Sequence, residues 1–265
     1  MPIGNYTVAF LDILGFKEAI DHVPLKDLAN RYEYVVVQIG DFLNRPFPNE
    51  PQDISFFPNH QPGQEWCKRH IFSDSIILFS LDGTSDSCLK LLLYAWKFTQ
   101  ILLGARVPIR GGITYGEMYV SEEQQVFLGK ALTKAYLLEK DQYWIGTAID
   151  DSVFTAFPAL DKEMKNSLLQ DIFLEYDVPM KDDATRKMRT LNWCYNLRVK
   201  EGIRSLFPLS KDQEIRAKQE NTLKYAEMVF SGNRANSQNQ DNLPFMLRIF
   251  DVAPGKPLTE HSDDL

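Results

Sequence analysis

The sequence is poor in cysteine and in excess positive charge. Cys67, Cys88 and Cys194 are its three cysteines, and their wide spacing forms neither a zinc pattern nor an even disulfide set. We therefore expect a protein of the reducing cytoplasm.

The 29 basic residues are outnumbered by 36 acidic ones, giving a net charge of -7. This balance argues against a general nucleic-acid binder, which shows a basic face, but it allows a single nucleotide whose phosphates a metal neutralises.

Long apolar runs are also lacking. No stretch approaches the roughly 20 residues of a membrane span, and no basic segment precedes an apolar one at the N-terminus. We expect neither a membrane span nor a signal peptide. The 265 residues, 44% of them hydrophobic, suffice for one large domain or a domain with an extension.

Two carboxylates interrupt apolar stretches. Asp12 follows the predicted strand 6–11 in YTVAFLDILGF, and Gly15 behind it marks a turn or a helix start. Asp74 lies in HIFSDSIILFS, at the turn of a hairpin predicted from strands 66–72 and 75–79. A buried carboxylate is costly unless a cation or hydrogen bonds satisfy it. We hypothesise that Asp12 and Asp74 meet and hold metal ions; the alternative is a helix cap and a turn residue.

The order of elements predicts the fold class. The first 150 residues alternate strand, helix, hairpin, helix, strand, hairpin, helix and strand, which indicates an α+β fold with helices on one face of a mainly antiparallel sheet. The predicted helices are 15–20, 25–43, 85–103, 129–140, 152–157 (capped by Asp150) and 212–230. The remaining predicted strands are 107–115, ended by Gly116, and 118–120, 125–128, 143–149, 172–178, 189–197 and 245–252. Segments 44–64 and 231–242 are predicted loops, and 253–265 a tail.

The carboxylates suit Mg²⁺ or Mn²⁺, which prefer oxygen ligands and take the rest of their shell from phosphates and water. Beyond Asp12, the backbone N–H groups of Leu14, Gly15 and Phe16 would point outward at a helix N-terminus and cradle a phosphate.

Four motifs occur in a fixed order between residues 6 and 140: FLDILGF, FSDSIILF, IRGGITYG and FLGKALTKAYLLE. Together they resemble the class III nucleotidyl cyclase catalytic domain. The resemblance implies a ferredoxin-like cyclase core at 1–202, with 203–265 as a helical extension packed on the core or the dimer interface. It implies two Mn²⁺ or Mg²⁺ ions per site, held by Asp12, Asp74 and the Ile13 carbonyl. The implied reaction makes a 3′,5′-cyclic monophosphate and pyrophosphate from a nucleoside triphosphate. A homodimer with shared active sites is also implied.

The chain departs from purine cyclases at the substrate. Thr133 and Leu137 occupy the positions where those enzymes carry an asparagine and an arginine. We expect Arg110, Lys130 and Lys134 to be catalytic residues that supply the positive charge of the missing arginine. We also expect Thr133 to contact the nucleotide.

The base-selecting positions match His70 and roughly Val126, neither of which is a residue that reads adenine or guanine. We therefore expect His70 to contact the base. The chain is most similar to the bacterial pyrimidine cyclases of Pycsar anti-phage defence, which make cyclic UMP or cyclic CMP for an effector protein. This comparison makes UTP the first choice of substrate and CTP the second.

Other interpretations stay open. One alternative function is a purine cyclase with an unusual pocket. Another is an inactive cyclase fold that binds a nucleotide or a partner. The alternative to a base contact is that His70 is an exposed strand residue without a role. In the alternative interpretation, Lys130 and Lys134 are solvated surface lysines. Arg110 then pairs with a structural carboxylate such as Glu117.

Overall fold

The structure is a computed structural model that describes residues 3–38, 65–166, 168–194 and 210–232. Its strands are β1 (Ile3–Ile13), β2 (Lys68–Phe72), β3 (Ser75–Phe79), β4 (Ile109–Ser121), β5 (Val126–Leu128), β6 (Thr147–Ile149), β7 (Phe173–Pro179) and β8 (Thr185–Leu191). They form one sheet in the order β2-β3-β1-β4-β6-β8-β7, with β5 paired to β4. The pair β4–β6 is parallel, and the other ladders are antiparallel.

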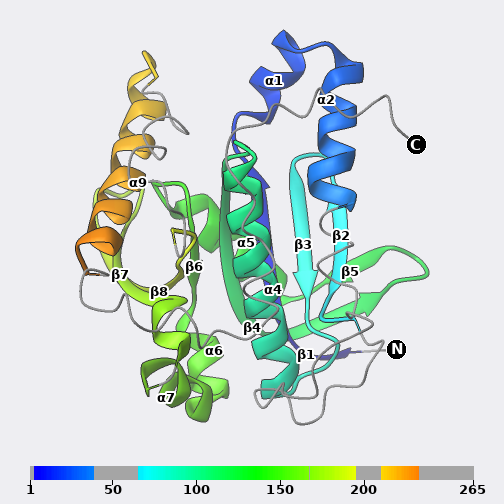
Figure 1. The fold of residues 1–265 in the computed structure, drawn as a ribbon. Helices are drawn as coiled ribbons and strands as arrows, with labels where there is room; N and C mark the ends of the chain where they lie inside the picture. Colours follow the sequence, from blue (N-terminus) through cyan, green and yellow to red (C-terminus); the bar gives the residue numbers. More distant parts are fainter. Residues whose placement is uncertain (1–2, 39–64, 167, 195–209, 233–265) are drawn as a thin grey trace, which may run out of the picture.

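The helices lie around this sheet (Figure 1). They are α1 (Phe16–His22), α2 (Leu25–Tyr32), the π-helix η1 (Glu33–Gln38), α4 (Ser85–Gly104), α5 (Lys130–Asp141), α6 (Asp151–Ala156), α7 (Pro158–Asn166), the 3₁₀ helix η2 (Leu168–Asp171) and α9 (Gln213–Gly232). The predicted α+β class with a mainly antiparallel sheet is confirmed. In the part of the chain that the structure describes, no helix is long and apolar enough to cross a membrane.

Alternation along β1 places helices on both faces of the sheet, because successive side chains of a strand point to opposite sides. Ala9 and Leu11 join the main core, which contains most of the buried α4. Val8 is buried in a second, smaller cluster with Ala131 and Ala135 of α5. The prediction that the helices share one face is therefore wrong in this detail, since α5 covers the opposite face from α4.

Close contact between α5 and β4 depends on glycine. A Cβ atom added at Gly112 would lie 2.4 Å from the Ala135 carbonyl oxygen, a distance that side chains do not tolerate. The IRGGITYG motif thus lets a helix backbone rest on the strand. This contact sets the height of α5 above the sheet.

Several predicted bounds need correction. Gly116 does not end a strand: β4 continues through it to Ser121, because its ladder with β1 runs unbroken from Ile109 to Tyr119. Strand β6 is shorter than predicted and begins at Thr147. Asp150 does cap α6, accepting the Ser152 N–H at 2.8 Å. The predicted loop 44–64, the strand 245–252, the tail 253–265 and the boundary after residue 202 lie outside the described residues.

Helix α9 packs on the sheet beside β7 and β8 (Figure 1). Its Tyr225 is fully buried, with ring centroids 4.9 Å from both Trp144 and Tyr176. The Thr222 hydroxyl oxygen accepts the Ile145 N–H at 2.8 Å. The described part of the predicted extension therefore contributes to the hydrophobic core.

Replacing Tyr225 with alanine should lower the free energy of unfolding by about 3–5 kcal/mol, because a large buried aromatic ring is lost. The control Ile215→Ala removes a half-exposed side chain from the same helix, so it should change stability by about 0.5 kcal/mol or less. Urea unfolding followed by circular dichroism measures both. Equal, small effects would mean that α9 is not part of the cooperative unit.

Candidate active site

Asp12 and Asp74 lie on neighbouring segments, as the sequence predicts. Asp12 pairs with Ser75 in the ladder between β1 and β3, and the Ile13 N–H donates to the Asp74 carbonyl at 2.9 Å. Asp74 occupies the β2–β3 turn. The hairpin register therefore brings the two residues to the same end of the sheet.

The electrostatic environment of Asp12 is unfavourable for a lone carboxylate. Burial raises its pKa to about 6, and the negative charges of Glu139 and Asp74 add to the shift. The positive charges of Arg110 and Lys181 oppose it without cancelling it. Asp12 thus lies in a site with a deficit of positive charge.

The donor set fits a divalent cation. Among the described residues, neither Asp12 nor Asp74 has an ion pair or a side-chain hydrogen bond that would satisfy its charge. Two carboxylates, with the Ile13 carbonyl as the predicted third ligand, offer the hard oxygen donors that Mg²⁺ and Mn²⁺ prefer. Within the described ranges no cluster of three acidic, histidine or cysteine ligands occurs, so phosphates and water would complete the shell.

Arg110 is held in a buried ion pair beside this site. Its Nη2 lies 2.5 Å from Oε1 of Glu139 and its Nε lies 2.7 Å from the same oxygen. The alternative that Arg110 pairs with a structural carboxylate is confirmed, although the partner is Glu139 of α5 and not Glu117. Arg110 also donates to the Gln142 carbonyl at 3.1 Å. The Arg110 side chain is 7% exposed, so its charge acts on Asp12 from a fixed position and is not open to substrate.

Sequence reasoning missed Glu139, although a signal was present. Ala131, Ala135 and Glu139 recur every four residues, which places the glutamate on the buried stripe of α5. A buried acid needs a cation. A glutamate on this stripe therefore indicates a basic residue on the facing strand, and Arg110 is that residue.

The predicted phosphate cradle is smaller than expected. The Leu14 N–H donates to the Pro108 carbonyl at 2.9 Å, so Leu14 does not offer a free donor and its assignment is corrected. Gly15 precedes α1 with a φ of 74°, a conformation that favours glycine. Apart from its chain neighbours, no atom of the described residues lies within 4 Å of the place where a Cβ would be. Gly15 and Phe16 remain as predicted contacts for a phosphate.

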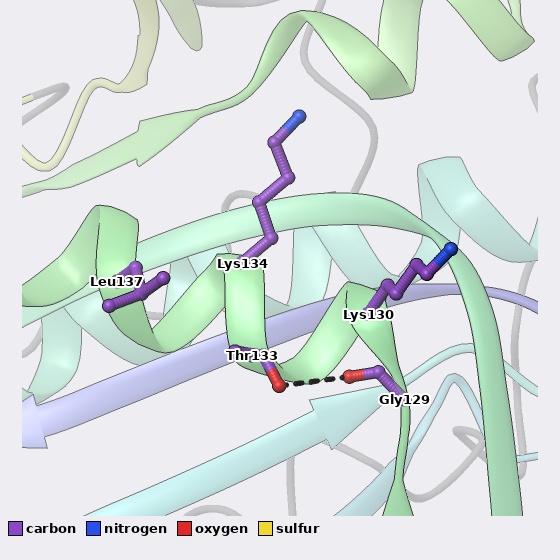
Figure 2. A pocket seen from close by; sticks show the side chains of 5 residues that line it. All are labelled: Gly129, Lys130, Thr133, Lys134 and Leu137. Atoms are coloured by element: carbon purple, nitrogen blue, oxygen red, sulfur yellow. Dashed lines mark hydrogen bonds between the residues drawn. The ribbon is translucent and has the colours of Figure 1, made fainter.

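The α5 residues line a shallow groove of about 430 Å³ (Figure 2). The groove contains Lys130, Thr133, Lys134 and Leu137, and its lysine side chains extend from the helix in different directions. The Thr133 hydroxyl donates to the Gly129 carbonyl at 3.2 Å. These residues form one surface, as their helical spacing predicts.

Lys130, at the start of α5, and the carboxylates lie at different levels of the sheet. Gly129 contacts Glu117 and Met118 of β4, whereas Asp12 pairs with Arg110 of the same strand. Seven residues of strand separate these levels by about 24 Å. One chain therefore does not bring Lys130 to Asp12.

Lys134 and His70 both have structural neighbours. The Lys134 ammonium lies 2.6 Å from an Asp150 carboxylate oxygen, and more than half of its side chain stays exposed. His70 is half-buried rather than exposed, with its ring 4.8 Å from Phe127. Phe127 in turn lies 5.4 Å from Phe79. His70 thus belongs to an aromatic surface formed by β2, β3 and β5.

No family model and no curated protein matches this chain in sequence. Its structure is similar to two solved structures of the guanylyl cyclase domain of the RhoGC fusion protein from the aquatic fungus Blastocladiella emersonii. The dimeric form has a TM-score of 0.50 at 14% identity, covering 72% of this chain and 98% of that one. The monomeric form has a TM-score of 0.50 at 12% identity, covering 72% and 96%.

The fold is that of a class III cyclase. The two neighbours have the same core architecture, a mostly antiparallel sheet with helices. The fold predicted from the four ordered motifs is thereby confirmed. At 12–14% identity the likeness extends to the cyclase fold alone.

The charge deficit at Asp12 predicts a pH-dependent stability. Its folded-state pKa of about 6 lies above the ordinary 3.8, so the folded protein binds more protons than the unfolded chain between about pH 4 and pH 6. The contribution of Asp12 to the free energy of unfolding therefore falls as pH rises from about 4 to about 6. Asp12→Asn should therefore raise the melting temperature at pH 7.5 in EDTA and raise it less at pH 5.

The control is Asp27→Asn, which removes an exposed carboxylate from α2. It should leave the melting temperature nearly unchanged at both pH values. An Asp12→Asn protein less stable than wild type at pH 7.5 would show that the carboxylate is already satisfied.

Proposed function

We propose that this protein is a nucleotide cyclase that converts a pyrimidine nucleoside triphosphate to its 3′,5′-cyclic monophosphate and pyrophosphate. The observation that carries the proposal is the pair Asp12 and Asp74, two adjacent carboxylates without a cationic partner among the described residues. A class III cyclase fold holds them together. A protein that only bound a partner would have no need to keep such a pair at a cost in stability.

Asp12, Asp74 and the Ile13 carbonyl would hold the divalent cations, Mn²⁺ or Mg²⁺. Bound there, such ions lower the pKa of an attacking hydroxyl and neutralise charge on the phosphates. The chain itself contributes rigidity. Asp12 lies in a strand paired on both sides, and the Arg110–Glu139 ion pair fixes the charge next to it.

The phosphates would be bound from two directions. The N–H groups of Gly15 and Phe16 open α1 next to the carboxylates and would face one end of the triphosphate. Lys130 and Lys134 would supply positive charge, with Thr133 contacting the nucleotide. Because the start of α5 lies about 24 Å along the sheet from Asp12, Lys130 would come from a second copy of the chain.

A homodimer is supported by exposed apolar side chains around both halves of the site. Phe72 is 76% exposed, Leu128 60% and Leu137 47%, and Tyr136 is also exposed. Exposed apolar groups of this size favour burial by a partner. A twofold axis would cover them and would form two equivalent sites.

The substrate proposal rests on the base-contacting positions. His70 lies against Phe127, so an aromatic surface and a hydrogen-bonding ring are adjacent. Such a pair can stack on a base and contact its edge. UTP is the first choice and CTP the second, because the positions that match the base-reading residues of purine cyclases carry His70 and Val126.

A purine substrate is the second candidate. It is favoured by the two solved neighbours, whose names identify them as guanylyl cyclase domains. An inactive fold that binds a nucleotide is favoured by Leu137, an apolar residue in the groove at the position of the missing arginine.

The product would act as a second messenger for a cyclic-nucleotide effector in anti-phage defence. We place the enzyme in the cytoplasm, consistent with its three free, buried cysteines.

Incubation with each of the four nucleoside triphosphates and Mn²⁺ should give cyclic UMP as the main product, with cyclic CMP second. Asp12→Ala and Asp74→Ala should each lower the rate roughly 100-fold or more, because transition-state charge stabilisation through the cations is lost. Asp27→Ala, on the exposed face of α2, serves as control and should retain the wild-type rate. Mass spectrometry identifies the products, and cyclic GMP or cyclic AMP as the main product would refute the pyrimidine assignment.

Shared active sites predict complementation between two inactive variants. Lys130→Ala and Asp12→Ala should each be inactive alone, whereas an equimolar, re-equilibrated mixture should recover roughly a quarter of the wild-type rate. Half of the dimers are then mixed, and each mixed dimer has one intact site. The control Lys165→Ala, at an exposed lysine of α7, should be fully active alone. No recovery in the mixture would place both residues in the same protomer's site.

A further inference from the structure

Tyr32, the last residue of α2, connects two parts of the candidate site that are distant in sequence. Its hydroxyl donates a hydrogen bond to the Ser73 carbonyl in the β2–β3 turn. Its ring centroid lies 5.7 Å from that of Phe16, at the start of α1. One side chain thus contacts both the turn that carries Asp74 and the predicted phosphate cradle.

The turn needs external support. Ser73 has a φ of 56°, a left-handed conformation that is unfavourable for a residue with a side chain. Such a backbone persists where surrounding contacts hold it. The Tyr32 hydroxyl binds the Ser73 carbonyl, and the Ile13 N–H binds the Asp74 carbonyl at 2.9 Å. The carbonyls on both sides of the Asp74 Cα are therefore fixed, and so is the direction of its Cα–Cβ bond.

The phenol also lies close to the Asp74 carboxylate. Burial raises the pKa of Tyr32, and the charge of Asp74 raises it further. A neutral phenol beside the carboxylate provides hydrogen bonding without introducing a charge that would compete with a cation.

The helix that presents Tyr32 is itself anchored. The π-helix η1 begins directly after Tyr32, and π-helical turns are frequent at functional sites. Arg69 of β2 donates to the carbonyls of Val36 and Val37, both at 3.1 Å. Helix and hairpin are therefore linked at two points, through Tyr32 to the β2–β3 turn and through Arg69 to η1.

We propose that Tyr32 is a positioning residue for the cation site: through its hydrogen bond to Ser73, it fixes the turn that orients Asp74 toward Asp12. This inference rests on the proposed function, because it assumes that the two carboxylates bind a divalent cation. Groups that orient metal ligands typically change metal affinity about 10–100-fold when they are removed.

The test is Tyr32→Phe, which retains the ring against Phe16 and removes only the hydroxyl. Tyr34→Phe is the matched control, because Tyr34 is 45% exposed on the adjoining π-helix. Mn²⁺ alone is titrated into each metal-stripped protein, and free Mn²⁺ is measured by electron paramagnetic resonance. We expect Tyr32→Phe to bind Mn²⁺ about tenfold more weakly, with Tyr34→Phe like wild type and both melting temperatures within about 4 °C of wild type.

In the activity assay, the Mn²⁺ concentration for half-maximal rate should rise by a similar factor in Tyr32→Phe. Unchanged Mn²⁺ affinity in Tyr32→Phe would overturn the proposal, as would equal weakening in both variants. If wild type converts none of the four nucleotides but Tyr32→Phe still binds Mn²⁺ more weakly, the proposed function fails and the positioning role stands. If wild type does not bind Mn²⁺ at all, the positioning role fails with the cation site.

Discussion

The buried ion pair between Arg110 and Glu139 is the interaction on which the candidate site depends. It joins the start of β4 to the end of α5, which packs on this strand. Both side chains are almost fully buried. Removing either partner would leave a buried charge unpaired, which is far more costly than the pair itself. The Gln142 side chain extends this contact by donating to the Gly111 and Leu138 carbonyls. Helix and strand are thereby fixed to each other directly beside Asp12.

This arrangement gives the site its electrostatic character. The Arg110 charge is largely committed to Glu139, so Asp12 remains a half-buried carboxylate with two acidic neighbours. A fold selected for stability alone would avoid such a group, whereas a cation-binding site requires it. The same reasoning applies to the turn around Asp74, where Ser73 adopts an unfavourable backbone conformation. Two local costs in this molecule thus lie at, or next to, the residues to which we assign the chemistry.

The geometry also explains why one chain is expected to be half of a working unit. The carboxylates lie at the end of β1, and the lysines of α5 begin near the far end of β4. A rigid sheet keeps Lys130 apart from the carboxylates of the same chain, since strands do not shorten. Pairing two copies is the simple way to bring them together. Helix α9 adds a separate contribution by covering β7 and β8 with Tyr225, which stabilises the side of the sheet away from the hairpin.

The sequence by itself determined the local features of this protein. The apolar strands, the hairpin around Asp74, the helix at 130–141 and the Asp150 cap follow from residue periodicity and local hydrogen bonding. The four motifs predicted the fold. Only the tertiary structure decided the partners. Arg110 and Glu117 are seven residues apart on one strand, so their side chains leave opposite faces of the sheet, and Arg110 meets Glu139 instead. Likewise Pro108 takes the Leu14 N–H, because strand register, which no local pattern specifies, sets which groups lie opposite each other.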